Sequence, residues 1–275
     1  MNILTKILAT KRDEIAASQR QRSFDDIYSE ARQIARPALS LSGSLRQSAT
    51  PIIAEFKRRS PSKGFINREA DVATVVAGYA AHGAAAISAL TDREYFAGSL
   101  ADLSAARQVS SVPLLRKDFI ISPYQLCEAR IAGADAALLI AAALTREQCA
   151  ELAAFARSLG LETLLEVHSE AELSYISPHI SAVGVNNRDL STFVTSTATS
   201  LTLAALIPDS YVKVSESGIS DTETVKTLQR AGFRGFLMGE IFMKADNPVQ
   251  AFAAFAESLK AESQQRRTFT AQADK

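Results

Sequence analysis

The sequence predicts an α/β protein that folds as a (βα)8 TIM barrel with an N-terminal helical extension. Two observations support this fold class: a series of short apolar runs, and the helical segments that separate them. Helices cover both faces of a parallel sheet, so its strands read as continuous apolar runs. Eight strand–helix units can close into a barrel, which typically takes about 250 residues. The runs span residues 52–57, 85–90, 113–117, 136–141, 162–167, 182–186, 211–215 and 235–238.

Helix boundaries occur in phase with these runs. In a capping box, a hydroxyl accepts a hydrogen bond from the third helical N–H, while Gln or Glu reaches back to the cap. Four such boxes, each a few residues after a predicted strand, begin at Ser122, Thr145, Ser169 and Ser220. Glycines suited to a left-handed helix end follow the helical patterns. These are Gly83, Gly133, Gly160 and Gly232.

The composition is that of an ordinary soluble protein. The chain has 275 residues, and 30 Lys and Arg balance 30 Asp and Glu. This balance argues against nucleic acid or an anionic membrane as a partner. No apolar run reaches the ~20 residues of a membrane span, and the first residues lack the pattern of a secretory signal. Because two cysteines in helical segments fit a reducing compartment, we expect a cytoplasmic protein, as a monomer or a weak homodimer.

Two segments flank the predicted barrel. Residues 1–48 are expected to form two helices and a loop that pack on one end of the barrel. Residues 49–260 form the catalytic barrel domain, and residues 261–275 are polar enough to predict a disordered tail. Neither flanking segment has the character of a second domain.

Catalytic groups in this fold come from the C-terminal ends of the strands and the loops that follow. Glu55 and Lys57 end the first run, and their spacing of two points both side chains to the same side. They are candidates for catalysis, or for a structural ion pair. Lys117 ends the third run, where partial burial and cationic neighbours would tune its pKa, although it could also be a solvated rim charge.

The fifth and sixth runs add polar groups. Glu166 lies within an apolar run, and its burial would raise its pKa and suit it to proton transfer. It could also simply partner a lysine. Asn186 can orient a polar substrate with its donor and acceptor. Arg188 can clamp an anion or pair with Asp189.

The last two runs predict a phosphate site. Ser217 and Gly218 follow the seventh run, and Gly239 and Glu240 follow the eighth. These two loops form the phosphate site in many such barrels, because glycine lets backbone N–H groups approach the phosphate oxygens. A phosphorylated small molecule is therefore the expected ligand.

No metal or cofactor is expected. The histidines form no cluster with ligand spacing, so structural or surface roles are assigned to His82, His168 and His179. No glycine-rich nucleotide-binding motif opens the first unit. The chemistry should therefore be acid–base catalysis by the protein's own side chains.

Motifs across the whole barrel resemble the indole-3-glycerol-phosphate synthase family. The motifs are those of residues 52–64, 88–92, 95–99, 115–120, 164–168, 184–190, 216–219 and 237–240. The N-terminal helical extension also resembles that of the family. The resemblance implies ring closure of 1-(o-carboxyphenylamino)-1-deoxyribulose 5-phosphate, with loss of carbon dioxide and water, in tryptophan biosynthesis.

The resemblance also implies roles for individual residues. Lys117 matches the general acid, and Glu166 matches a residue that acts in proton transfer, together with Lys57. Lys57 also matches a cation near the substrate carboxylate and phosphate. How the acid and base steps divide among these three is left open.

The remaining matches are to substrate-binding residues. Those that hold the anilino and ribulose parts are Glu55, Asn186, Glu216 and the cation Arg188. Those on the phosphate side are Ser60, Ser217, Gly218, Gly239 and Glu240. Phe96 and Phe119 match the anthranilate pocket, although both could equally be core residues. Some relatives have serine at the position of Glu240, so its backbone N–H rather than its carboxylate would bind phosphate.

Two other functions are weighed against this one. Phosphoribosylanthranilate isomerase is also a phosphate-binding barrel, but its chemistry calls for a Cys/Asp pair, and no cysteine here ends a strand. A non-catalytic phosphate-binding barrel would have lost Lys117, Glu166 or Lys57, and all three are present.

Overall fold

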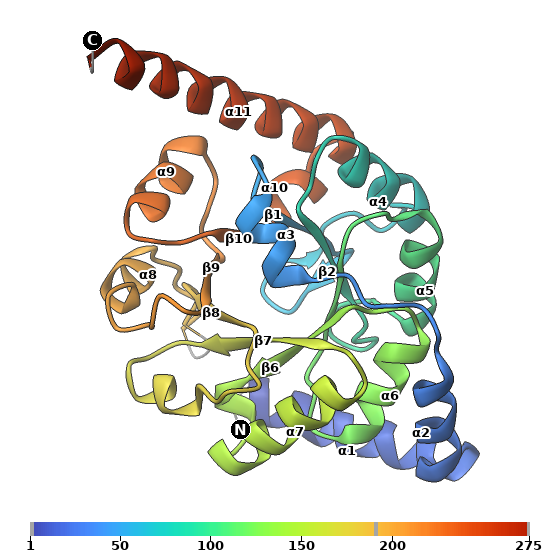
Figure 1. The fold of residues 1–275 in the computed structure, drawn as a ribbon. Helices are drawn as coiled ribbons and strands as arrows, with labels where there is room; N and C mark the ends of the chain where they lie inside the picture. Colours follow the sequence, from blue (N-terminus) through green and yellow to red (C-terminus); the bar gives the residue numbers. More distant parts are fainter. Residues whose placement is uncertain (1–2, 190–191, 274–275) are drawn as a thin grey trace.

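Eight parallel strands close into a barrel in the computed structural model, which describes residues 3–189 and 192–273, with side chains as far as residue 261 (Figure 1). The predicted fold class is confirmed, and each predicted strand agrees with the structure to within one residue at either end. The barrel strands are β1 (Ile52–Phe56), β4 (Ala86–Leu90), β5 (Leu114–Lys117), β6 (Ala136–Ile140), β7 (Glu162–Val167), β8 (Ala182–Asn186), β9 (Val212–Glu216) and β10 (Gly235–Met238). Two short antiparallel strands, β2 (Arg59–Ser60) and β3 (Gly64–Phe65), form a hairpin in the loop after β1.

Helices surround the barrel, and those before β10 connect its strands (Figure 1). They are α4 (Val72–Ala81), α5 (Leu100–Val109), α6 (Pro123–Ile131), α7 (Arg146–Ser158), α8 (Ala198–Leu203), α9 (Thr222–Arg230), α10 (Glu240–Met243) and α11 (Pro248–Ala273). Two short 3₁₀ helices, η1 (Ala141–Ala143) and η2 (Ala171–Tyr175), follow β6 and β7. Outward-facing strand residues pack on the helices in the larger apolar cluster.

The helix-end predictions are partly confirmed. The boxes at Ser122 and Thr145 form as predicted. The box at Ser220 is wrong, because Asp221 caps α9 and its Oδ1 accepts from the Thr224 N–H at 2.7 Å. The box at Ser169 is also wrong, since η2 follows and the Glu172 carboxylate accepts from the His168 N–H instead. All four predicted end glycines have positive φ, between 75° and 101°.

Strand alternation separates the barrel interior into an apolar floor and a polar upper layer. A smaller apolar cluster fills the interior, with Ile53, Leu115 and Leu164 among its members. Residues two positions further along a strand point the same way. The next inward-facing layer is therefore Glu55, Lys117 and Glu166, at the C-terminal ends of the strands.

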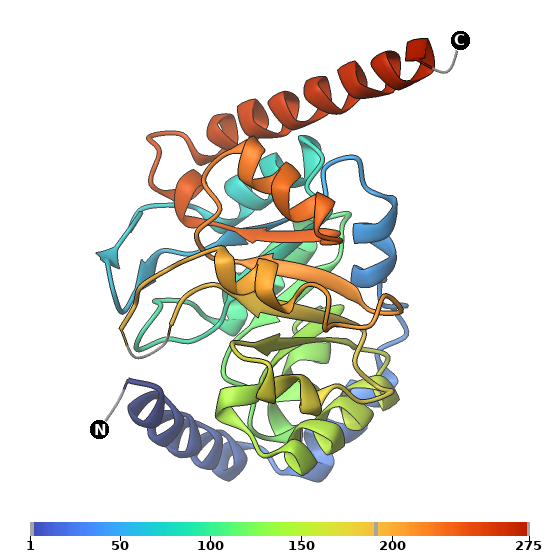
Figure 2. The same cartoon turned by 90° about the vertical axis from the view of Figure 1, so that its left-hand side faces the viewer.

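The N-terminal extension contacts both ends of the barrel rather than one, and it has three helices rather than two. These are α1 (Ile3–Gln21), α2 (Phe24–Gln33) and α3 (Leu41–Gln47). Leu41 and Leu45 of α3 join the interior apolar cluster and close the N-terminal end of the strands. Figure 2 shows α1 on the opposite side, beside the loops at the C-terminal ends.

A buried lysine fixes α1 to the barrel. Lys11 is 2% exposed, and its Nζ lies 2.9 Å from Asp92 Oδ2 and 3.2 Å from Asp118 Oδ1. Burial opposes the charged form, but these carboxylates more than offset it and raise the pKa of Lys11. Glu14, one helical turn away, lies 2.7 Å from the same nitrogen.

We expect Lys11→Met to lower the free energy of unfolding by about 3 kcal/mol, because it leaves the buried Asp92 carboxylate without its cation. Urea unfolding curves would measure the change. Lys6→Met, an exposed lysine on the same helix, is the matched control. Similar unfolding midpoints for the two variants would contradict a stabilising role for the buried ion pairs.

The C-terminal segment differs from the prediction of a disordered tail. Helix α11 continues through this segment to Ala273 and extends past the barrel in both views (Figures 1 and 2). Its sequence is rich in Ala and Gln and has no glycine after Pro248, a composition that favours helix. Within the described residues, no helix combines the length and the apolar character needed to cross a membrane.

Candidate active site

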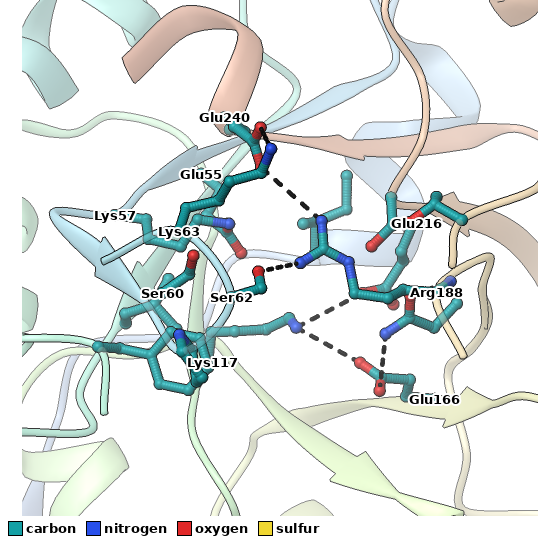
Figure 3. A pocket seen from close by; sticks show the side chains of 18 of the residues that line it. Glu55, Lys57, Ser60, Ser62, Lys63, Lys117, Glu166, Arg188, Glu216 and Glu240 are labelled. Atoms are coloured by element: carbon teal, nitrogen blue, oxygen red, sulfur yellow. Dashed lines mark hydrogen bonds and ion pairs between the residues drawn. The ribbon is translucent and has the colours of Figure 1, made fainter. Parts of the chain in front are cut away.

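A cavity of about 680 Å³ opens at the C-terminal ends of the barrel strands (Figure 3). Every site residue predicted from the sequence lines this cavity. They are Glu55, Lys57, Ser60, Phe96, Lys117, Phe119, Glu166, Asn186, Arg188, Glu216, Ser217, Gly218, Gly239 and Glu240. Leu190, at the end of one motif, lies outside the described residues, as do the first two and last two residues of the flanking segments.

The strand register sets the spacing of the polar groups around the cavity. Asn186 of β8 is paired with Glu216 of β9, and β7 brings Glu166 beside the end of β6. Gly184, two residues before Asn186, leaves room for Glu216. A Cβ at this glycine would lie 2.3 Å from Glu216 Oε1, so no other residue fits without displacing the carboxylate.

Lys117 lies at the centre of a ring of carboxylates. Its Nζ is 3.4 Å from Glu166 Oε2 and 3.6 Å from Glu216 Oε2 (Figure 3). Burial disfavours the ammonium form, but Glu166, Glu216 and Glu55 more than compensate and raise the pKa of Lys117. The expectation of cationic neighbours is therefore wrong. Lys117 is an ammonium at neutral pH, able to donate a proton and unable to accept one.

Glu55 and Lys57 form an ion pair across one side of the cavity, with Nζ and Oε1 2.5 Å apart. Glu55 is 4% exposed. Burial favours its neutral form, but the charges of Lys57 and Lys117 outweigh this and lower the pKa of Glu55. The pair lines the cavity, so a structural ion pair and contact with a substrate are compatible at these two residues.

Glu166 is held as a carboxylate by three groups. Its Oε2 faces Lys117, while its Oε1 accepts from Asn186 Nδ2 at 3.1 Å and lies 3.4 Å from His168 Nε2. Burial alone would raise the pKa, as the sequence analysis expects. Lys117, His168 and the Asn186 hydrogen bond more than reverse this and lower the pKa of Glu166. The predicted direction is wrong, although the predicted burial, 2% exposed, is confirmed.

Glu216 is the carboxyl group with the raised pKa. It is 1% exposed, and among the described residues neither of its oxygens has a hydrogen-bond partner. Burial, with the nearby charges of Glu166 and Glu55, raises the pKa of Glu216 to about 8 despite the opposing charge of Lys117. Glu166 and Glu216, the two carboxyl groups beside the Lys117 ammonium, therefore differ in protonation, as acid and base groups in active sites do.

The raised pKa of Glu216 predicts that the free energy of unfolding depends on pH. A folded-state pKa above the usual 4.5 stabilises the fold at low pH, and that stability falls as the pH rises through about 8. In wild type we expect the free energy of unfolding to fall with pH between roughly pH 5 and 8, by an amount approaching about 1.4 kcal/mol per pH unit. Glu216→Gln should remove this dependence. Urea unfolding across pH would measure it, with Glu240→Gln at the cavity rim as control. Parallel curves for wild type and Glu216→Gln would contradict the protonated state.

The predicted phosphate-binding loops follow β9 and β10, and β10 is paired with β1, the strand of Glu55. Ser217 and Gly218 both have left-handed backbone, with φ of 67° and 73°, directly after β9. Gly239 precedes α10 and packs against Glu55, where an added Cβ would lie 2.7 Å from the Glu55 Cβ. Nearby, the buried Ser60 Oγ has no hydrogen-bond partner in the described part of the chain.

Arg188 spans the rim of the cavity (Figure 3). Its Nη1 donates to Ser62 Oγ at 3.0 Å, and its Nη2 lies 3.7 Å from Glu240 Oε2. Lys63 approaches the same glutamate, with 4.0 Å between Nζ and Oε1. The Glu240 carboxylate thus faces two rim cations, which agrees with assigning phosphate binding to its backbone rather than its side chain.

An apolar part of the cavity lies beside Lys117. The rings of Phe96 and Phe119 line it, with centroids 6.2 Å apart and a 41° angle between the planes. Helix α1, which was not predicted to reach the cavity, also lines it through Ile3, Leu4 and Ile7. His168 was predicted to have a structural or surface role, although its spacing of two from Glu166 could have placed both side chains on one side.

Comparison with known proteins identifies the family. The family model described as indole-3-glycerol phosphate synthase matches residues 4–255. The chain belongs to the indole-3-glycerol phosphate synthase family. Named indole-3-glycerol phosphate synthases agree over nearly their whole length: that of Bacteroides thetaiotaomicron is 50% identical over 94% of this chain and 99% of its own. That of Burkholderia ambifaria is 44% identical over 92% of this chain and 98% of its own.

Solved structures agree on the fold. KGPDC from Streptococcus mutans is 15% identical, with a TM-score of 0.58, over 77% of this chain and 97% of its own. The tryptophan synthase complex from Pyrococcus furiosus is 17% identical, with a TM-score of 0.56, over 77% of this chain and 98% of its own. The family and activity recognised from the motifs, indole-3-glycerol phosphate synthase of tryptophan biosynthesis, are confirmed by the sequence relatives.

Proposed function

We propose that the chain acts as a carbon–carbon lyase on 1-(o-carboxyphenylamino)-1-deoxyribulose 5-phosphate, using only its own side chains. One observation supports this most: a buried ammonium, Lys117, lies between a carboxylate, Glu166, and a protonated carboxyl group, Glu216. The substrate phosphate would occupy the loops with Ser217, Gly218, Gly239 and the side chain of Ser60. Phe96 and Phe119 would hold the anthranilate ring beside Lys117.

The first step joins the ring carbon that bears the carboxylate to the ketone carbon of the ribulose chain. As this bond forms, the carbonyl oxygen accepts a proton from Lys117 and becomes a hydroxyl group. The anilino nitrogen supplies the electron pair and becomes an iminium. Loss of carbon dioxide then returns an electron pair to the ring and neutralises that nitrogen.

Dehydration completes the indole. The new hydroxyl group leaves as water with a proton from Lys57, and Glu166 removes a proton from the neighbouring CH₂. Glu166 lies 3.4 Å from Lys117, so the proton it takes can return to the amine that lost one. Lys117 and Lys57 each give one proton and Glu166 takes one, so the reaction consumes one proton overall, as the decarboxylation of a carboxylate requires. Glu55, Asn186 and Arg188 would orient the anilino and ribulose groups.

Turnover with carboxyl-labelled substrate tests the proposal. We expect indole fluorescence and labelled carbon dioxide to appear in equal amounts. The chain has no tryptophan, so the indole signal has little protein background. Labelled carbon dioxide without indole fluorescence would mean that dehydration does not follow decarboxylation, contrary to the proposal. Neither signal from folded protein would contradict the proposal.

We further propose a cytoplasmic enzyme that is a monomer or a weak homodimer. The buried free thiols of Cys127 and Cys149 support a reducing compartment. Sedimentation at several protein concentrations would measure the oligomeric state. A stable assembly larger than a dimer would contradict this part of the proposal.

A further inference from the structure

The carboxylate of Glu166 has a neighbour outside the cavity. His168 follows β7 directly, and its Nε2 lies 3.4 Å from Glu166 Oε1, the oxygen that does not face Lys117. His168 is not among the described residues that line the cavity, so it would act on the reaction through its neighbours, and Glu166 is the cavity-lining carboxylate that it contacts.

A second carboxylate holds the other side of the imidazole ring. Glu172 of η2 lies 3.4 Å from His168 Nδ1, through its Oε2. The same oxygen accepts from the His168 backbone N–H at 2.6 Å. This bond fixes Glu172 relative to the residue whose ring it faces. The irregular connection after β7, in place of a regular helix start, thus positions a carboxylate behind the histidine.

The two contacts determine the charge of the ring. Both ring nitrogens are buried and have no hydrogen-bond partner in the part of the chain that the structure describes, so each has only its carboxylate neighbour. A neutral imidazole carries one N–H and no charge, whereas an imidazolium carries an N–H on each nitrogen and a positive charge beside both carboxylates. Burial opposes this charge, but Glu172, Glu166 and the more distant Glu216 outweigh it and raise the pKa of His168.

We propose that His168, held by Glu172, is a positioning residue that keeps Glu166 ionised and aimed into the cavity for proton abstraction. This inference rests on the proposed role of Glu166 as the base. The other groups that face Glu166 are Lys117 of β5, Asn186 of β8 and the carboxyl groups of Glu55 and Glu216. Lys117 loses its charge when it donates a proton, whereas the imidazolium takes no part in that step. His168 is therefore the cation that remains beside Glu166 when the base is needed.

The pH dependence of kcat separates this role from simple packing. The acid limb of the profile reports ionisation of Glu166 in the substrate complex. A neutral side chain at position 168 removes a cation and raises the Glu166 pKa, so the limb should move to higher pH. For His168→Gln we expect a move of about one pH unit, which is about a tenfold loss of kcat on the limb and a smaller loss on the plateau.

Two more variants complete the experiment. Glu172→Gln should move the limb in the same direction by less, and it replaces His168→Gln if that variant does not fold. His179→Gln, an exposed histidine before β8, should leave the limb in place. The substrate phosphate titrates equally in every variant, so it does not contribute to differences between their kcat–pH profiles.

The outcomes are distinct. A limb that moves in His168→Gln and not in His179→Gln supports the proposal. An unmoved limb, with kcat lowered equally at every pH, would overturn it. Glu166→Gln with wild-type turnover would instead remove the proposed base itself, and would show that the proposed function rather than the positioning role has failed.

Discussion

Lys117→Met is expected to lower kcat by about a thousandfold, within the range for loss of a general acid. Methionine keeps much of the apolar stem but cannot protonate the carbonyl oxygen as the carbon–carbon bond forms. It also leaves Glu166 and Glu216 beside each other without the ammonium between them. Product fluorescence under saturating substrate would measure the loss.

Two controls make the Lys117 result specific. Lys63→Met removes another lysine that lines the cavity, from an exposed position at the rim, and should alter KM more than kcat. Lys117→Arg keeps the charge but releases a proton poorly, so it should remain far below wild type. Near-wild-type turnover by the arginine variant would mean that position 117 supplies only charge and that the acid lies elsewhere.

The placement of the site could be predicted from the sequence because it depends on a local rule. Alternation along a strand puts Glu55 and Lys57 on one side, and the C-terminal ends of parallel strands meet at one end of a barrel. Lys117 and Glu166 follow from the same rule. The phosphate loops follow from glycine in the last two units. None of these inferences needs a contact between distant parts of the chain.

The electrostatics could not be predicted, because they depend on contacts between distant strands. The sequence shows that Glu166 is buried, but not that Lys117, Asn186 and His168 all face it. Burial alone gives the wrong sign for its pKa. The position of α1 could not be predicted for the same reason, because Lys11 contacts aspartates that follow two separate strands.

Glu166→Gln is also expected to lower kcat by about a thousandfold, by removing the base that completes the indole. Glutamine is nearly the same size and can still contact Asn186, so the geometry of the cavity should persist. An amide oxygen accepts a hydrogen bond but cannot take a proton from the CH₂ group at neutral pH. Carbon dioxide release should be impaired less than indole formation, because decarboxylation precedes the step that uses Glu166.

Glu216→Gln tests whether the reaction needs the ionised carboxylate of Glu166 in particular or any carboxyl group beside Lys117. Both glutamates approach Lys117 to within 3.6 Å, and each substitution changes a carboxyl group to an amide. With its pKa raised to about 8, Glu216 is mostly neutral at pH 7, so glutamine changes its charge little there. We expect its kcat to fall less than about tenfold, against about a thousandfold for Glu166→Gln. Equal losses in the two variants would contradict the assignment of Glu166 as the base and of Glu216 as the neutral carboxyl group.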